Sequence, residues 1–216
     1  MYSQSINFGK EVFFALPSKA LYWKKLETLI VADLHLGKSI SFAKNKQFLP
    51  PYDTKETLEK LYKTLDEVKP KKLIIVGDLI HDFDSILSLQ KNDYKNLKGY
   101  IEKIKFIWVK GNHDNDTNIE GFEKYSNYKI YNFMFSHQPV ISPLYQICGH
   151  YHPKVNIIHR GKSIFKAAFV HNRKILILPS FGAYTGGLDA RSKVLEKILG
   201  EEICSYPIGK NKVYKI

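Results

Sequence analysis

The chain has 216 residues, of which 44% are hydrophobic, and its formal net charge is +12. That length and apolar content suit one domain of generous size, and the two cysteines, Cys148 and Cys204, are too few for a disulfide framework. No stretch approaches the roughly 20 apolar residues of a membrane span, and the N-terminus lacks the basic and apolar regions of a signal peptide. We therefore expect a single domain over residues 1–216, in the cytoplasm and without a membrane partner.

The positive charge comes almost entirely from lysine, because arginine occurs only at Arg160, Arg173 and Arg191. A basic protein often has a polyanion such as nucleic acid as its partner. A lysine-rich composition also follows from an AT-rich genome. Charge by itself therefore favours nucleic-acid binding only slightly.

Apolar runs rich in Ile and Val predict strands, and amphipathic patterns between some of them predict helices. In chain order we expect strands at 20–25 and 28–35, a helix at 53–68, a strand at 72–79, a helix at 85–104, strands at 105–113, 131–139, 145–153, 164–170 and 174–181, and a helix at 188–199. Asp53 and Glu56 have the spacing of a capping box, and Gly200 ends the last helix. Helices separate the strands of the first half, which indicates parallel pairing there. The predicted fold is an α/β domain with a two-sheet β-sandwich flanked by helices.

Polar side chains gather where five successive predicted strands end. They are Asp33 and His35, Asp78, Asn112 and His113, His137, and then His150 and His152. One histidine at a strand end is usually structural, but five such coincidences make that explanation improbable. Carboxylate, imidazole and amide groups suit Mn, Fe or Zn, and the lack of cysteine in the set argues against a closed structural zinc site. These ligands serve two divalent ions if Asp78, on a middle strand, bridges them.

The motifs "DLH" (33–35), "GDLIH" (77–81), "GNHD" (111–114), "SHQ" (136–138) and "GHYH" (149–152) resemble the five motifs of the calcineurin-like metallophosphoesterases. The resemblance implies the sandwich fold and two metal sites that share Asp78. One site would take Asp33, His35, Asp78 and His152, and the other would take Asp78, Asn112, His137 and His150. It also implies that His113 is the catalytic imidazole that serves the leaving-group oxygen.

The second motif departs from the phosphatase branch, where "GDxxDRG" supplies an aspartate and an arginine. Here His81 stands in place of that aspartate and the arginine is absent, which resembles the nuclease subunit of double-strand-break repair complexes. His81 is therefore a second candidate catalytic residue. It follows Asp78 by three residues, so we expect a helical turn to bring it to the side of Asp78 and close to His113. Two divalent ions, set against Asp33, Asp78 and one hydroxide, leave about one positive charge, which matches a phosphodiester better than a monoester.

Two longer stretches, "ALYWKKLETLIVADLHLGKS" (20–39) and "LPSFGAYTGGLD" (178–189), resemble the ligase-associated DNA damage response endonucleases, the PdeM family. This resemblance implies Mn-dependent hydrolysis of nucleic acid, with DNA as the expected substrate and a repair ligase or helicase as partner. One alternative is a phosphodiesterase for small substrates such as 2′,3′-cyclic nucleotides. Another is a non-catalytic metal-binding scaffold, although such proteins tend to lose the histidine that this chain keeps in "GNH".

Two features near these motifs have competing interpretations. Lys38, Lys44 and Lys46 follow the first motif, and they either line a groove for a phosphate backbone or are simply solvated. The glycine-rich "GAYTGG" is either functional or only a tight connection between a strand and a helix.

Overall fold

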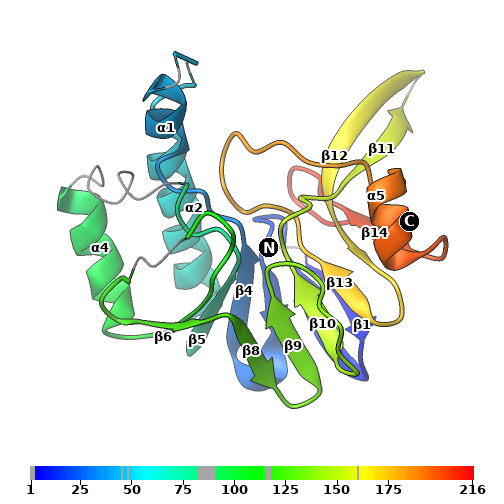
Figure 1. Ribbon diagram of the computed structural model, residues 1–216, viewed down its shortest axis with the longest axis horizontal. Coiled ribbons are helices and arrows are strands. Elements are labelled where there is room, and N and C mark those ends of the chain that lie inside the picture. Colours follow the sequence, from blue (N-terminus) through cyan, green and yellow to red (C-terminus); the bar gives the residue numbers. More distant parts are fainter. Residues whose placement is uncertain (1–2, 45, 48, 82–90, 115–117, 160) are drawn as a thin grey trace.

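Two β-sheets packed face to face, with helices on their outer sides, make up the fold in the computed structural model (Figure 1). The structure describes residues 3–44, 46–47, 49–81, 91–114, 118–159 and 161–216. The predicted two-sheet α/β class is confirmed.

The first sheet is built by the N-terminal half of the chain and has the strand order β1-β2-β3-β4-β5-β6-β7. These strands are β1 (Gln4–Phe8), β2 (Glu11–Ala15), β3 (Leu21–Trp23), β4 (Thr28–Ala32), β5 (Lys72–Val76), β6 (Lys105–Val109) and β7 (Phe122–Tyr125), with a 3-10 turn η1 (Lys24–Leu26) before β4. The pairs from β4 to β7 are parallel, as the alternation of strands and helices predicted. The pairs from β1 to β4 are antiparallel.

The second sheet has the order β11-β12-β13-β10-β9-β8, and β14 pairs with β12 beside it. Its strands are β8 (Asn127–Ile130), β9 (Phe133–Ser136), β10 (Tyr145–Cys148), β11 (Lys154–His159), β12 (Lys162–His171), β13 (Ile175–Ile177) and β14 (Cys204–Pro207). The neighbours β9, β10 and β13 run parallel to one another. The β11–β12 hairpin extends away from the rest of the sandwich (Figure 1).

Helices cover the outer faces of both sheets. They are α1 (Lys38–Lys44), α2 (Asp53–Val68), α4 (Lys91–Ile101) and α5 (Lys193–Leu199). In Figure 1, α1, α2 and α4 lie at one side of the molecule, and α5 lies at the other side near the β11–β12 hairpin. Leu61 of α2 packs under the first sheet, and Leu195 of α5 packs on the second.

Strand β4 shows how side-chain alternation builds these layers. Ile30 and Ala32 point into the core between the sheets, whereas Leu29 and Val31 point outward toward α2. All four are completely buried. A strand covered on both faces must be apolar throughout, which is why this stretch reads as a continuous hydrophobic run.

The helix predictions hold with corrections at the ends. Helix α2 has the predicted bounds, but its N-cap is Tyr52, without a side-chain cap bond, so the capping box predicted from Asp53 is wrong. The Asp53 carboxylate instead accepts a hydrogen bond from the Ser39 amide. Helix α5 begins only after Ser192, whose side chain caps it, and Gly200 ends it as predicted. Of the helix predicted at 85–104, residues 91–101 are helical, and residues 85–90 lie outside the described residues.

Two further findings concern the predictions about cysteine and membranes. Cys148 and Cys204 are both free, as expected. Among the described residues, no helix combines the length and the apolar character that crossing a membrane requires.

Candidate metal centre

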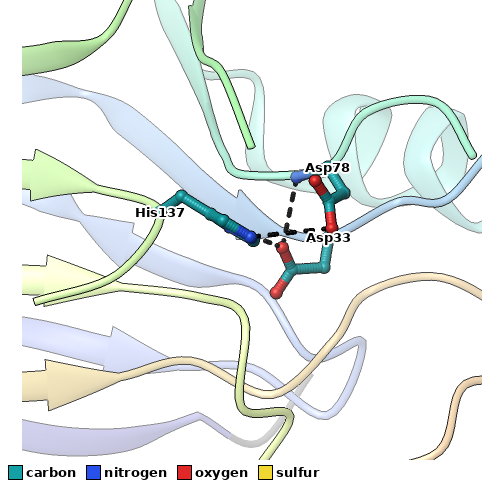
Figure 2. Close-up of side chains that lie close together, drawn as sticks. All are labelled: Asp33, Asp78 and His137. Carbon is teal, nitrogen blue, oxygen red and sulfur yellow. Dashed lines mark hydrogen bonds and ion pairs between the residues drawn. The ribbon is translucent and has the colours of Figure 1, made fainter. Parts of the chain in front are cut away.

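The polar strand ends meet at one edge of the sandwich. Asp33 directly follows β4, Asp78 follows β5 and Asn112 follows β6, and these three strands are parallel neighbours. His137 and His150 follow β9 and β10, which are parallel neighbours in the second sheet. Figure 2 shows side chains from both sheets, Asp33 and Asp78 from one and His137 from the other, pointing toward one another. The carboxyl ends of parallel strands commonly form sites in α/β proteins.

The predicted ligands fall into two groups. In the first, Nε2 of His152 lies 3.2 Å from Oδ2 of Asp33 and 3.4 Å from Nε2 of His35. In the second, Nε2 of His137 lies 2.8 Å from Oδ1 of Asn112 and 3.0 Å from Nδ1 of His150. The structure thus brings all the predicted ligands together in two clusters.

Asp78 lies between these two groups. Its Oδ2 atom is 4.0 Å from Nε2 of His35 in the first group and 3.6 Å from Nε2 of His137 in the second. Its Oδ1 atom instead accepts a hydrogen bond from the His113 amide at 3.0 Å. One carboxylate oxygen therefore faces both groups, while the other fixes the side chain to the "GNHD" loop.

Burial sets the electrostatics of the centre. The Asp33 side chain is completely buried and Asp78 is 3% exposed, and neither forms an ion pair with a lysine or arginine among the residues that the structure describes. Burial by itself would raise the pKa of Asp33, but His137 and His152 outweigh it and hold that pKa below its usual range. Burial lowers the pKa of His35 to about 3. Burial also opposes a charge on His137, but Asp33 and the other carboxylates raise its pKa.

The backbone around the centre is unusual in two ways. Asp33, His35, His150 and His152 all have positive φ angles, between 46° and 68°, a region that residues other than glycine rarely adopt. The glycines of the motifs are needed because a side chain would not fit there, and Gly77 also has a positive φ angle of 93°. A Cβ atom at Gly77 or Gly149 would collide with the Asp33 carboxylate, and one at Gly111 would collide with that of Asp78. Glycine at these positions therefore lets the backbone approach the carboxylates of Asp33 and Asp78 closely.

A sequence model of the calcineurin-like phosphoesterase family matches residues 26–200, most of the chain and all five motifs. The chain belongs to the calcineurin-like phosphoesterases. This phosphoesterase is accordingly a metal-dependent hydrolase.

One solved structure agrees with the fold of the phosphoesterase, and a second is less similar. The crystal structure of the nuclease MPE from Pseudomonas putida has a TM-score of 0.74 at 23% identity, and the match covers 99% of this chain and 100% of that chain. Yfce, a phosphoesterase from E. coli, has a TM-score of 0.43 at 11% identity, with coverage of 88% and 97%. No curated protein sequence matches the chain.

The donor set of the phosphoesterase fits divalent cations. Among the residues that the structure describes, the two buried carboxylates face histidines but no lysine or arginine, and their charge is costly unless a cation compensates it. Asp33, Asp78 and His137 present one ligand atom each within 4.8 Å of one another, so donors from both groups converge around Asp78. A neutral His35, which its lowered pKa favours, is the form that binds a metal. Carboxylate, imidazole and amide oxygen together suit Mn, Fe or Zn.

The two candidate catalytic histidines lie side by side. The rings of His81 and His113 are stacked, with centroids 5.0 Å apart and planes inclined by 18°. Nδ1 of His113 lies 3.2 Å from the carbonyl oxygen of His81, so a proton on Nδ1 completes a hydrogen bond there. The His35 ring lies 5.7 Å from that of His81 and 5.8 Å from that of His113, which places the pair beside the first group of ligands.

A helical turn was the expected route by which His81 comes to the same side as Asp78, and that expectation is wrong. Residues 79–81 are not helical, and Ile80 forms an isolated parallel bridge with Leu36. The His81 amide donates to the Leu36 carbonyl at 3.0 Å. Pairing with the "DLHLG" segment, rather than a helix, therefore positions this histidine.

Asp114 is a residue of the site whose role sequence reasoning missed. Its side chain is completely buried, and it accepts hydrogen bonds from the amides of Leu79, Ile80 and Gly111 and from Nε1 of Trp108. It thereby ties the "GDLIH" loop to the "GNHD" loop. Burial raises the pKa of Asp114 to about 6, although the hydrogen bonds oppose that rise. Its position directly after the predicted catalytic residue His113 was the one feature of the sequence that could have indicated a role in the site.

Proposed function

We propose that this phosphoesterase is a dinuclear-metal phosphodiesterase that hydrolyses nucleic acid, with DNA as the expected substrate and Mn as the expected metal. The observation that carries the proposal is the position of Asp78, one oxygen of which faces both groups of ligands. The fold likeness to a nuclease supports it. A repair ligase or helicase as partner and a cytoplasmic location belong to the same proposal.

Each ligand has a role in this proposal. Asp33, His35 and His152 would hold one ion, Asn112, His137 and His150 would hold the other, and Asp78 would serve both. Two such ions would supply Lewis-acid stabilisation of the phosphoryl oxygens and a water of lowered pKa. The protein's own contribution is a rigid, buried donor set whose carboxylates are oriented by backbone amides, such as that of His150 at 2.7 Å from Asp33.

His113 is the proposed general acid for the leaving oxygen. Its Nδ1 atom is engaged with the His81 carbonyl, which leaves Nε2 as the atom able to deliver or share a proton. The stacked His81 ring would restrict the orientation of His113 and influence its proton affinity. Both rings lie on the His35 side of the centre, so we place the leaving group there.

A diester preference follows from the charges. Histidine at position 81 replaces the acidic residue of the phosphatase motif, and the sequence has no arginine between Asp78 and Arg160. Without that arginine, the centre has less positive charge with which to hold a monoester dianion.

The test is a substrate panel for the metal-free protein reconstituted with Mn²⁺. We expect bis-p-nitrophenyl phosphate to be hydrolysed faster than p-nitrophenyl phosphate near neutral pH, and DNA strands to be cleaved. Plasmid, single-stranded, hairpin and 2′,3′-cyclic nucleotide substrates separate a nuclease from an enzyme for small diesters. Faster hydrolysis of the monoester would contradict the proposal.

Metal content provides a second test. The change Asp78→Asn should lower the bound metal from about two ions per chain to less than one, because it weakens both groups together. Asp66→Asn makes the same chemical change on the exposed face of α2, where the carboxylate accepts a bond from Tyr100, and should leave the metal content unchanged. At most one ion in the unmodified protein, unaffected by Asp78→Asn, would refute the dinuclear centre.

A further inference from the structure

An aromatic side chain lies on the outer side of the histidine pair. The ring of Phe42, on α1, is 5.7 Å from that of His81, which in turn stacks on His113. Phe42 is partly exposed, and it belongs to none of the hydrophobic clusters formed by the described residues. Core packing among the described residues therefore does not account for a phenylalanine here, one ring beyond the proposed general acid.

A lysine one helical turn earlier accompanies this ring. Lys38 and Phe42 are four residues apart on α1 and so share a face of the helix, with Nζ of Lys38 5.2 Å from the Phe42 ring centroid. The same Nζ donates a hydrogen bond to the Tyr184 carbonyl at 2.9 Å. Lys38 belongs to "HLGKS" and Tyr184 to "GAYTGG", so this bond joins two stretches that lie 146 residues apart in the sequence.

The "GAYTGG" loop is fixed to the metal centre and thereby fixes Lys38. The Gly182 amide donates to the Asp33 carbonyl at 3.1 Å, and the Ala183 amide donates to Oγ1 of Thr57 at 3.0 Å. At the other end of the loop, a Cβ atom at Gly187 would collide with the His152 carbonyl. The loop is thus held between the backbones of two proposed ligands of the same ion, and Lys38 is attached to its middle.

We propose that Phe42 and Lys38 form a subsite for the nucleoside that leaves as the free alcohol, with Phe42 stacking on its base and Lys38 contacting its next backbone phosphate. This rests on the proposed function. An exposed aromatic ring binds any base through its face, so this subsite selects nucleotides without selecting a sequence. Lys38 keeps N–H groups beyond the one donated to Tyr184, and a lysine next to a stacking ring is a common arrangement in sites for single strands.

The test uses thymidine dinucleotides in which one sugar carries no base. The unmodified protein should cleave the intact dinucleotide about 5- to 100-fold more efficiently, in kcat/KM, than one without the base on the leaving side, as expected for one base–aromatic stack. Loss of the base on the other side should have a smaller effect. The products identify the leaving side, since they show which nucleoside retains the phosphate.

Variants assign the preference to Phe42. We expect Phe42→Ala to bring the ratio of kcat/KM between the intact and leaving-side abasic substrates to about one, and Phe42→Tyr to retain it, since tyrosine also stacks. Phe165→Ala is the control and should not alter the ratio, because Phe165 is 54% exposed and belongs to β12, a strand that lies across the molecule from α1 (Figure 1). A packing role for Phe42 would lower stability and leave the ratio unchanged.

The contribution of Lys38 is measured with a terminal phosphate. A dinucleotide with a phosphate on the far side of the leaving nucleoside should bind more tightly than one without it, and Lys38→Ala should remove that gain. Lys55→Ala, which changes an exposed lysine of α2, should preserve it.

Three results would overturn the proposal. An equal rate for intact and leaving-side abasic dinucleotides in the unmodified protein would exclude the stack, and so would an unchanged ratio in Phe42→Ala. If bis-p-nitrophenyl phosphate is hydrolysed but no dinucleotide or DNA strand is cleaved, the nucleic-acid function itself fails and the subsite fails with it.

Discussion

Replacing Asp114 by alanine should destabilise the fold more than any other single change near the metal centre outside the ligands. The carboxylate accepts four hydrogen bonds, from Leu79, Ile80, Trp108 and Gly111, at 2.9, 3.1, 3.0 and 2.6 Å. Alanine leaves all four donors without this acceptor at a position that is completely buried. An unsatisfied buried donor costs about 1–3 kcal/mol, and water that enters the space would satisfy some of them. We therefore expect a loss of about 4 kcal/mol or more in the free energy of unfolding.

Asparagine at the same position provides a graded comparison. One of its two terminal groups still accepts hydrogen bonds, whereas the other is an NH₂ group that faces N–H donors. Asp114→Asn should therefore cost about half as much as alanine, about 2 kcal/mol. Asp66→Ala is the surface control, and a change at an exposed position is expected to stay within about 0.5 kcal/mol.

The assay is urea unfolding of metal-free protein followed by far-ultraviolet circular dichroism. Fluorescence is a poor probe here, because Trp108 itself loses a hydrogen-bond partner. Metal titration of the same variants is an independent measurement. Asp114 ties together the loops that carry Asp78 and Asn112, so the variants should also bind metal more weakly. An Asp114→Ala protein that unfolds within about 1 kcal/mol of the unmodified one would refute the reasoning from unsatisfied donors.

The remaining predictions concern catalysis, salt and pH. In steady-state kinetics, His81→Ala should lower kcat about 10²- to 10⁴-fold while the protein keeps its bound metal. The double variant with His113→Ala should be little slower than the slower single variant. Loss of metal in His81→Ala would instead show that His81 has a structural role. Changing Lys38 and Lys44 together to alanine should flatten the salt dependence of DNA affinity by about one to two units of slope, whereas an affinity independent of salt would mean solvated lysines. Burial and nearby Lys19 lower the pKa of Lys60 to about 7, so the unfolded chain binds more protons between pH 7 and the ordinary value of 10.5, and stability should rise with pH across that window. Lys60→Met should abolish this rise. If the urea midpoint of Lys60→Met still rises between neutral and alkaline pH as much as that of the unmodified protein, Lys60 is not its cause.

Much of the fold could be predicted because local patterns determined it. The apolar face of α2 is continuous, and its bounds agree with the prediction. Polar residues at strand ends could be assigned to one site, since parallel neighbours bring their carboxyl ends together. The prediction missed helix α1 and strands β1, β2, β7, β8, β11 and β14. They are short elements of four to seven residues, and such lengths give little periodicity to recognise.

The details of the site depend on contacts between distant parts of the chain. The bond from Lys38 to Tyr184 spans 146 residues, and no local pattern indicates which lysine will find which carbonyl. The His81 ring was expected near His113, which is correct, but the predicted helical turn was wrong because tertiary pairing with Leu36 replaced it. The motif that contains Asp114 does not by itself indicate what this residue does. Its role depends on four donors, which come from the "GDLIH" loop, the "GNHD" loop and strand β6.

The division of the ligands between the two sheets has a consequence for biosynthesis. A nascent chain that ends before β9 offers Asp33, His35, Asp78 and Asn112, but none of the three histidines that complete the two groups. Under the proposed ligand assignment, neither cation site would be complete until the second sheet is made. Cation uptake would then be a late step of maturation, and a cell short of the metal would accumulate folded but unloaded protein rather than unfinished chains.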